Sequence, residues 1–222
     1  MEAMFRYDEA VENQVNKVKK MLHLSMNGVV SENMSSLDYQ LNYGVLLPRI
    51  KELAAELERS FPLAQRLWFS NCREMMIMAT VVCPVESMNL KEALKWVERC
   101  HNMELVEQLC LNLFRKVEGA SDWVSVFLSS SAPFSKATGY VLASFMMRNE
   151  TIAQSAIDAC VEKLREDIVS DEYVVYSSVA RFLRLYAERN SEWVTAYVDG
   201  LDTTKGVGVA WVQDNVRTVL NY

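Results

Sequence analysis

Glycine and proline are scarce in this sequence of 222 residues, which contains 7 glycines and 4 prolines. Sheet-rich folds need frequent tight turns built from these two residues, whereas helices joined by short loops do not. Apolar residues make up 50% of the chain, including 12 methionines, so a sizeable core can be buried. We therefore expect an all-α chain.

Long apolar runs are also missing. The longest apolar stretch without serine or threonine runs from Met75 to Ala79, far short of the roughly 20 residues that a bilayer-spanning helix needs. The first residues include Glu2, Arg6 and Asp8 rather than a basic patch followed by an apolar segment. We expect neither a signal peptide nor a membrane partner.

The usual ingredients of metal sites and of nucleophilic catalysis are few. The chain has 2 histidines, and its five cysteines form no C-x-x-C pair, so we expect no metal and no Ser–His or Cys–His catalysis. It also has no phosphate-binding glycine-rich loop, and we expect no cofactor. We interpret the cysteines as reduced core residues of a cytoplasmic protein; they are Cys72, Cys83, Cys100, Cys110 and Cys160.

The net charge of the chain is −6, with a sequence pI near 5.1. Taken alone, this charge argues against a dedicated nucleic-acid binder, because phosphate contacts need clustered lysine and arginine. The total charge does not exclude a local basic face.

Apolar residues recur at helical spacing nearly throughout the chain. Clear stripes lie within residues 11–22, 50–57, 90–97, 175–186 and 209–220. Pro48 suits the first turn of the second stripe, and Asn89 with Glu92 has the spacing of a capping box before the third. Helices of about ten to seventeen residues between short breaks are typical of paired-helix repeats. We predict one repeat domain, 1–222, with a less regular part at 1–40; an ordinary helical bundle is the alternative.

Several short motifs follow one another in a characteristic order. They are Tyr43-Gly44-Val45 followed by Pro48, Leu67-Trp68 followed by Arg73-Glu74, Trp96-Val97 followed by residues 102–110, and Leu183-Arg184-Leu185-Tyr186-Ala187. This order, over roughly residues 40 to 200, resembles the AlkD-type DNA alkylation repair proteins.

The resemblance implies a fold and an activity. The fold is a right-handed superhelical stack of antiparallel HEAT-like helix pairs, an α-solenoid, whose concave face cradles duplex DNA. The activity is hydrolysis of the glycosidic bond of cationic N3- and N7-alkylpurines. The sugar left behind is cationic, so a carboxylate and aromatic faces stabilise it. We also expect a monomer.

The family's catalytic constellation is only partly retained. Its aspartate corresponds to Glu107 and the tryptophan before it to Met103, while its arginine corresponds to Lys136 and its second tryptophan to Arg181. A carboxylate and a cation therefore remain, but both aromatic faces are lost. Glu107 and Met103 also fit ordinary roles as a solvated charge and a core side chain. The candidate catalytic residues are Glu107 and Met103, and the candidate DNA-binding residues are Lys136, Arg181, Arg184 and Arg148.

The helices expected to line the concave face have a modest basic bias. Residues 71–83, 102–116, 134–148, 172–189 and 207–222 contain nine lysines and arginines and six acidic residues. We predict a DNA alkylation repair-like protein that binds duplex DNA on a concave basic face, either as a glycosylase with an altered site or as a binder without hydrolysis. The alternative, favoured by the net acidity and the lost aromatics, is an inactive helical-repeat scaffold that binds a protein or another nucleic acid.

Overall fold

The computed structural model describes residues 8–34 and 37–220. Within these ranges the chain forms helices and no β-strand, and the only strand-like pairing is a parallel bridge between Leu41 and Cys72. The expected all-α class is confirmed. No helix within the same ranges is both long and apolar enough to span a bilayer. Glu2 and Arg6, on which the expectation of no signal peptide rested, lie outside the described residues.

The chain divides into two compact units, Met1–Leu113 and Phe114–Tyr222. The first unit contains α1 (Glu9–Leu24), α2 (Gly28–Asn33), α3 (Leu47–Ala55), α4 (Phe61–Trp68), α5 (Arg73–Val82), η2 (Val85–Ser87), α6 (Leu90–Val97) and α7 (Met103–Asn112). The second unit contains η3 (Phe114–Lys116), η4 (Ala120–Asp122), α8 (Trp123–Leu128), α9 (Pro133–Arg148), α10 (Gln154–Asp167), α11 (Tyr173–Ala187), α12 (Ser191–Asp199), η5 (Thr203–Lys205) and α13 (Val207–Leu220).

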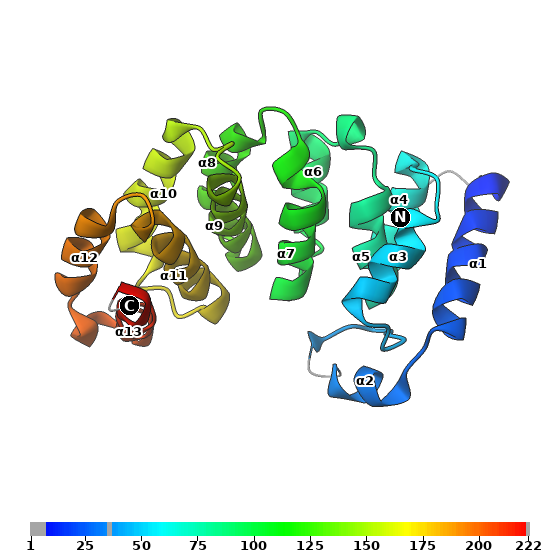
Figure 1. Ribbon diagram of the computed structural model, residues 1–222, viewed down its shortest axis with the longest axis horizontal. Coiled ribbons are helices and arrows are strands. Elements are labelled where there is room, and N and C mark those ends of the chain that lie inside the picture. Colours follow the sequence, from blue (N-terminus) through cyan, green and yellow to red (C-terminus); the bar gives the residue numbers. More distant parts are fainter. Residues whose placement is uncertain (1–7, 35–36, 221–222) are drawn as a thin grey trace. The chain divides into compact units, whose positions relative to one another are not determined.

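The helices of the first unit pack in two layers (Figure 1). Helix α5 lies between α3 and α7 in one layer, and α4 contacts both α5 and α1. In the other layer, Trp68 of α4 stacks on Trp96 of α6 with ring centroids 4.9 Å apart, and both side chains are fully buried. The tryptophans of the Leu67-Trp68 and Trp96-Val97 motifs are therefore part of the core of this unit.

The second unit repeats the same arrangement. Helices α9, α11 and α13 lie side by side in one layer, which we call the α9–α11–α13 layer, and α8, α10 and α12 pack against them (Figure 1). Tyr140 of α9 lies against Phe182 of α11, and the Arg189 side chain just after α11 reaches the Met147 carbonyl at the end of α9. Since both contacts join equivalent positions along the two helices, α9 and α11 run in the same direction, as corresponding helices of successive repeats do.

Local sequence signals set where several helices begin. Pro48 lies in the first turn of α3, as expected. The Asn89 side chain accepts a hydrogen bond from the Glu92 amide at 3.1 Å, so the predicted cap of α6 is present. The Glu92 carboxylate does not complete a capping box, because Lys95 and Gln65 donate hydrogen bonds to it instead.

All five cysteines are buried and none forms a disulfide. Their interpretation as core residues is confirmed. Burial raises the pKa of the Cys72 and Cys83 thiols to about 12. Because the thiolate is the reactive form, these two side chains are inert in the folded protein.

Gly44, in the Tyr43-Gly44-Val45 motif, is required by backbone geometry. Its φ angle is +68°, in the left-handed region that side chains with a Cβ disfavour. A Cβ at this position would lie 2.5 Å from the Ser31 amide nitrogen and closer still to the Asn27 carbonyl oxygen. The segment before α3 can therefore pack against α2 only with glycine at this position.

Replacing Gly44 by alanine should lower the free energy of unfolding by about 2 kcal/mol or more, because the φ angle and the backbone clash both oppose it. Urea unfolding followed by circular dichroism measures the change. Gly28→Ala is the matched control, since no atom lies within 4 Å of its Cβ position. Equal stability of the two variants would contradict this account of Gly44.

Candidate nucleic-acid interface

Two of the sequence motifs are in direct contact. The Tyr43 and Val45 amides donate hydrogen bonds to the Glu74 carboxylate at 3.0 and 3.2 Å, and the Arg73 guanidinium donates to the Val45 carbonyl at 2.9 Å. Motifs that lie about thirty residues apart in the sequence thus form one unit of structure. The Arg73-Glu74 pair holds the loop that leads into α3.

Arg73 also connects this loop to α7. Its guanidinium donates two hydrogen bonds to the Glu104 carboxylate, at 2.8 and 2.6 Å, and the Tyr39 hydroxyl donates to the same carboxylate at 2.8 Å. Burial alone would lower the pKa of Arg73, but the hydrogen bonds and charges of Glu104 and Glu74 outweigh it and raise the pKa. The first turn of α7 is therefore fixed by a buried ionic network.

Arg73, one of the nine basic residues counted toward a basic face, does not contribute to one. Its side chain is only 2% exposed and its charge is matched by Glu74 and Glu104. It stabilises the fold and offers no free charge to DNA. An Arg-Glu pair at the start of an otherwise apolar helix, α5, was the sequence signal that could have indicated a buried ion pair.

Met103 and Glu107, the candidate catalytic residues, both lie on α7 in the first unit. They are four residues apart and both side chains are partly exposed, so they share a face of the helix, as predicted. Asn102 caps the helix by accepting a hydrogen bond from the Leu105 amide at 3.1 Å. The cap and the hydrogen bonds from Arg73 to Glu104 therefore fix the first turn of the helix that carries Glu107.

Lys136 lies near the start of α9 in the second unit, where its charge is already matched. Its ammonium group donates hydrogen bonds to Glu166, at 3.1 Å, and to Asp167. Asp167 is 1% exposed and also accepts a hydrogen bond from the Tyr140 hydroxyl at 2.8 Å. Burial acts to lower the pKa of Lys136, but its bonds to Asp167 and Glu166 raise it overall. This lysine holds α10 against α9.

The other candidate cations gather on α9 and α11. The Arg181 guanidinium carbon lies 4.7 Å from the centre of the Phe145 ring, so α11 presents a cation against an aromatic face of α9. Arg148 is exposed and Arg184 partly exposed, and neither forms an ion pair with a described residue. The sequence did not indicate a role for Phe145, because its partner Arg181 lies on a helix that begins 28 residues later.

The described residues contain no group of three or more histidine, cysteine, aspartate or glutamate side chains that could hold a metal ion. The candidate residues form two separate surfaces. In the first unit, α7 carries a partly exposed carboxylate, and in the second unit α9 and α11 carry arginine side chains. A partly exposed arginine held against an aromatic ring is suited to contact phosphate oxygens or the faces of bases.

The sequence matches the profile of the DNA alkylation repair enzyme family over residues 31–206. The chain belongs to this family. A solved structure of "a new family of proteins related to the HEAT-like repeat DNA glycosylases with affinity for branched DNA structures" is similar in fold, with a TM-score of 0.76 and 15% sequence identity over 93% of this chain and 96% of that one. The expected HEAT-like architecture is confirmed. No curated protein matched the sequence.

In this member of the DNA alkylation repair enzyme family, Arg73→Met should lower the free energy of unfolding by about 3 kcal/mol, because Glu104 and Glu74 lose their buried counter-charge. Arg49→Met is the control: Arg49 pairs with Glu52, and both side chains are about half exposed or more, at 49% and 63%. That control should cost less than about 1 kcal/mol. If the two variants unfold at the same urea concentration, the buried network contributes little to the free energy of unfolding.

Proposed function

We propose that this protein binds double-stranded DNA, including branched DNA, through the sugar–phosphate backbone, and that base release is at most a slow secondary activity. The observation that carries the proposal is the Arg181 guanidinium against Phe145, with Arg148 and Arg184 on the same two helices. Further support comes from the affinity for branched DNA stated for the protein of similar fold. Phosphate contacts position DNA without reading its sequence.

We assign the phosphate contacts to Arg148, Arg181 and Arg184 rather than to Lys136. The guanidinium groups of Arg148 and Arg184 are not engaged by carboxylates of described residues, whereas the Lys136 ammonium is bonded to Glu166 and Asp167. A cation already matched by two carboxylates gains little from a phosphate. An acidic protein, with a net charge of −6, can still bind DNA where such arginines cluster.

Replacing Arg181 or Arg184 by glutamine should weaken binding to duplex and junction DNA and lower the salt slope of binding by about one unit for each phosphate that the side chain neutralises. Fluorescence anisotropy at two or more salt concentrations measures both quantities. Arg217→Gln is the control, because Arg217 on α13 is already paired with Asp199 at 2.7 Å. Wild-type affinity and salt slope in both Arg181→Gln and Arg184→Gln would rule out this surface.

A second candidate is a glycosylase with an altered site. The observation in its favour is the carboxylate of Glu107, which lies partly exposed on the face of α7 that also carries Met103. A carboxylate there would stabilise the sugar cation that forms as a cationic alkylpurine departs. The missing aromatic at Met103 removes the second source of that stabilisation, so we expect turnover to be slow.

The test is release of a methylated purine from duplex DNA under single-turnover conditions, with enzyme in excess. If the protein is a glycosylase, Glu107→Gln should slow release by about ten- to a thousandfold, and Met103→Trp should speed it. If both wild type and Glu107→Gln release the base at the spontaneous rate, the protein binds DNA without hydrolysing the glycosidic bond. Failure to bind DNA at all would favour the scaffold alternative, in which the same surfaces bind a protein.

A further inference from the structure

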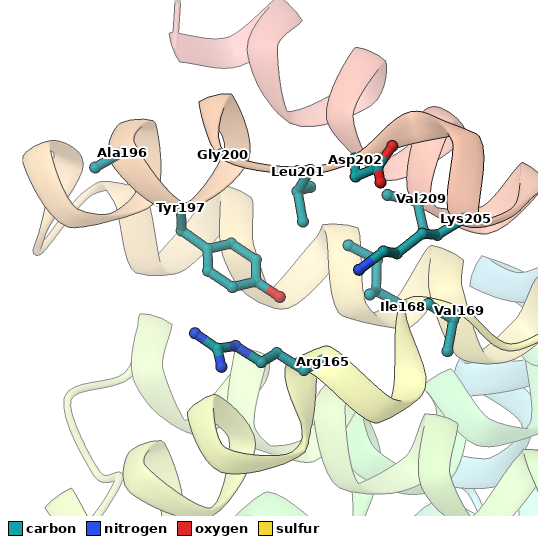
Figure 2. A pocket seen from close by; sticks show the side chains of 10 residues that line it. All are labelled: Arg165, Ile168, Val169, Ala196, Tyr197, Gly200, Leu201, Asp202, Lys205 and Val209. Carbon is teal, nitrogen blue, oxygen red and sulfur yellow. The ribbon is translucent and has the colours of Figure 1, made fainter.

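A pocket of about 440 Å³ lies in the second unit, between the end of α10, the end of α12 and the start of α13 (Figure 2). Its volume is in the range of small-molecule sites, which are typically about 300–1,000 Å³. The apolar side chains of Ile168, Leu201 and Val209 line it. None of the candidate DNA-binding residues contributes to it, so it is a separate feature of the surface.

Two cations line this pocket, and neither is held in an ion pair by the described part of the chain. The side chains of Arg165, on α10, and Lys205, on η5, are exposed and form no ion pair or hydrogen bond with a described residue. In Figure 2 the Lys205 ammonium group points toward the Tyr197 hydroxyl, and the Arg165 side chain extends along the other side of the Tyr197 ring. The contrast with Lys136 is direct, because that lysine is bonded to two carboxylates.

The Tyr197 hydroxyl is buried and has no hydrogen-bond partner among the described residues. Its ring is held in place by stacking on Trp193, with centroids 5.2 Å apart and planes 8° from parallel. A buried hydroxyl without a partner is destabilising, and native structures rarely keep one without a reason. Tyr197 is one of the residues that line the pocket, so its hydroxyl is a donor available to a ligand bound there.

Asp202 is the one acidic residue of the pocket. Its Oδ1 atom accepts hydrogen bonds from the Thr204 amide and hydroxyl, at 3.1 and 2.6 Å, and so holds the turn of η5. The Thr204 bonds lower the pKa of Asp202, and the charge of Lys205 adds to them, so the carboxylate is ionised at neutral pH. With two cations and one anion, the pocket carries a net positive charge and a second carboxylate oxygen, Oδ2, that can accept a hydrogen bond.

We propose that this pocket binds the phosphomonoester of a nucleotide, with the phosphate between Arg165 and Lys205, the Tyr197 hydroxyl as a third donor, and the nucleoside against the apolar wall. A phosphomonoester carries a charge of about −1.5 to −2 on three terminal oxygens and so matches two cations and a hydroxyl together, whereas a carboxylate carries a single negative charge. The volume exceeds that of inorganic phosphate, and the apolar lining fits an attached planar base. The Asp202 carboxylate can accept a hydrogen bond from a sugar hydroxyl.

The phosphomonoester has two sources, a free mononucleotide and the 5′-phosphate end of a DNA strand. Isothermal titration at constant ionic strength compares deoxyadenosine monophosphate with deoxyadenosine, and a 5′-phosphorylated short oligonucleotide with the same oligonucleotide ending in a hydroxyl. In at least one pair, the phosphate should tighten binding by about tenfold or more. Tightening in the first pair alone indicates a mononucleotide site, and tightening in the second alone indicates a strand-end site. Equal binding within both pairs overturns the proposal.

Three variants locate the effect in the pocket. Arg165→Gln and Lys205→Gln should each weaken binding of the phosphorylated ligand by about tenfold, whereas Lys163→Gln, on α10 outside the pocket, should not. Tyr197→Phe should weaken binding yet keep or raise the thermal midpoint, because it removes a hydroxyl without a partner. A merely structural hydroxyl would leave ligand affinity unchanged, and wild-type affinity in both cation variants would also overturn the proposal. Both oligonucleotides carry the same backbone, so contacts with the arginines proposed to bind duplex DNA cancel in the comparison, and either proposal can fail alone.

Discussion

Burying the Arg73 guanidinium requires that its charge and its hydrogen-bond donors be matched inside the protein, because an unpaired buried charge costs several kcal/mol. Glu104 accepts two of its hydrogen bonds, and the Val45 carbonyl accepts another. Glu74 adds a second negative charge and binds the amides of the loop before α3. The Arg73 side chain thereby fixes the positions of that loop, of α5 and of the first turn of α7. Glu107 lies on α7, about one turn after Glu104.

The second unit uses the same principle with different residues. Asp167 is buried between the Lys136 ammonium and the Tyr140 hydroxyl, and this cluster joins α10 to α9. The Arg181 guanidinium, in addition, lies against the face of the Phe145 ring. Arg73 and Lys136, which hold the fold together, therefore differ from Arg148 and Arg184 in having carboxylate partners, and not in their type of charge.

This distinction bears on how an acidic member of the DNA alkylation repair enzyme family could bind DNA. The net charge of −6 counts every ionisable side chain equally. Buried or paired cations such as Arg73 and Lys136 contribute little to the electrostatic potential at the surface. The carboxylates that pair with them contribute equally little. What matters is the arrangement of the surface cations that form no ion pair with a described residue, such as Arg148 and Arg184, and Arg165 and Lys205 at the pocket near Tyr197.

The sequence alone determined the helical class, because scarce glycine and proline and a helical apolar period reflect local backbone preferences. It also determined the starts of α3 and α6, where Pro48 and Asn89 act on their own first turns, and the order of motifs that indicated the family. Only the tertiary structure decided that Arg73 is bonded to Glu104, that Lys136 is bonded to Asp167, that Arg181 lies on Phe145 and that Tyr197 and Arg165 line one pocket. Each of these pairs spans at least 31 residues, and contacts at such separations depend on how helices pack, which no local pattern encodes.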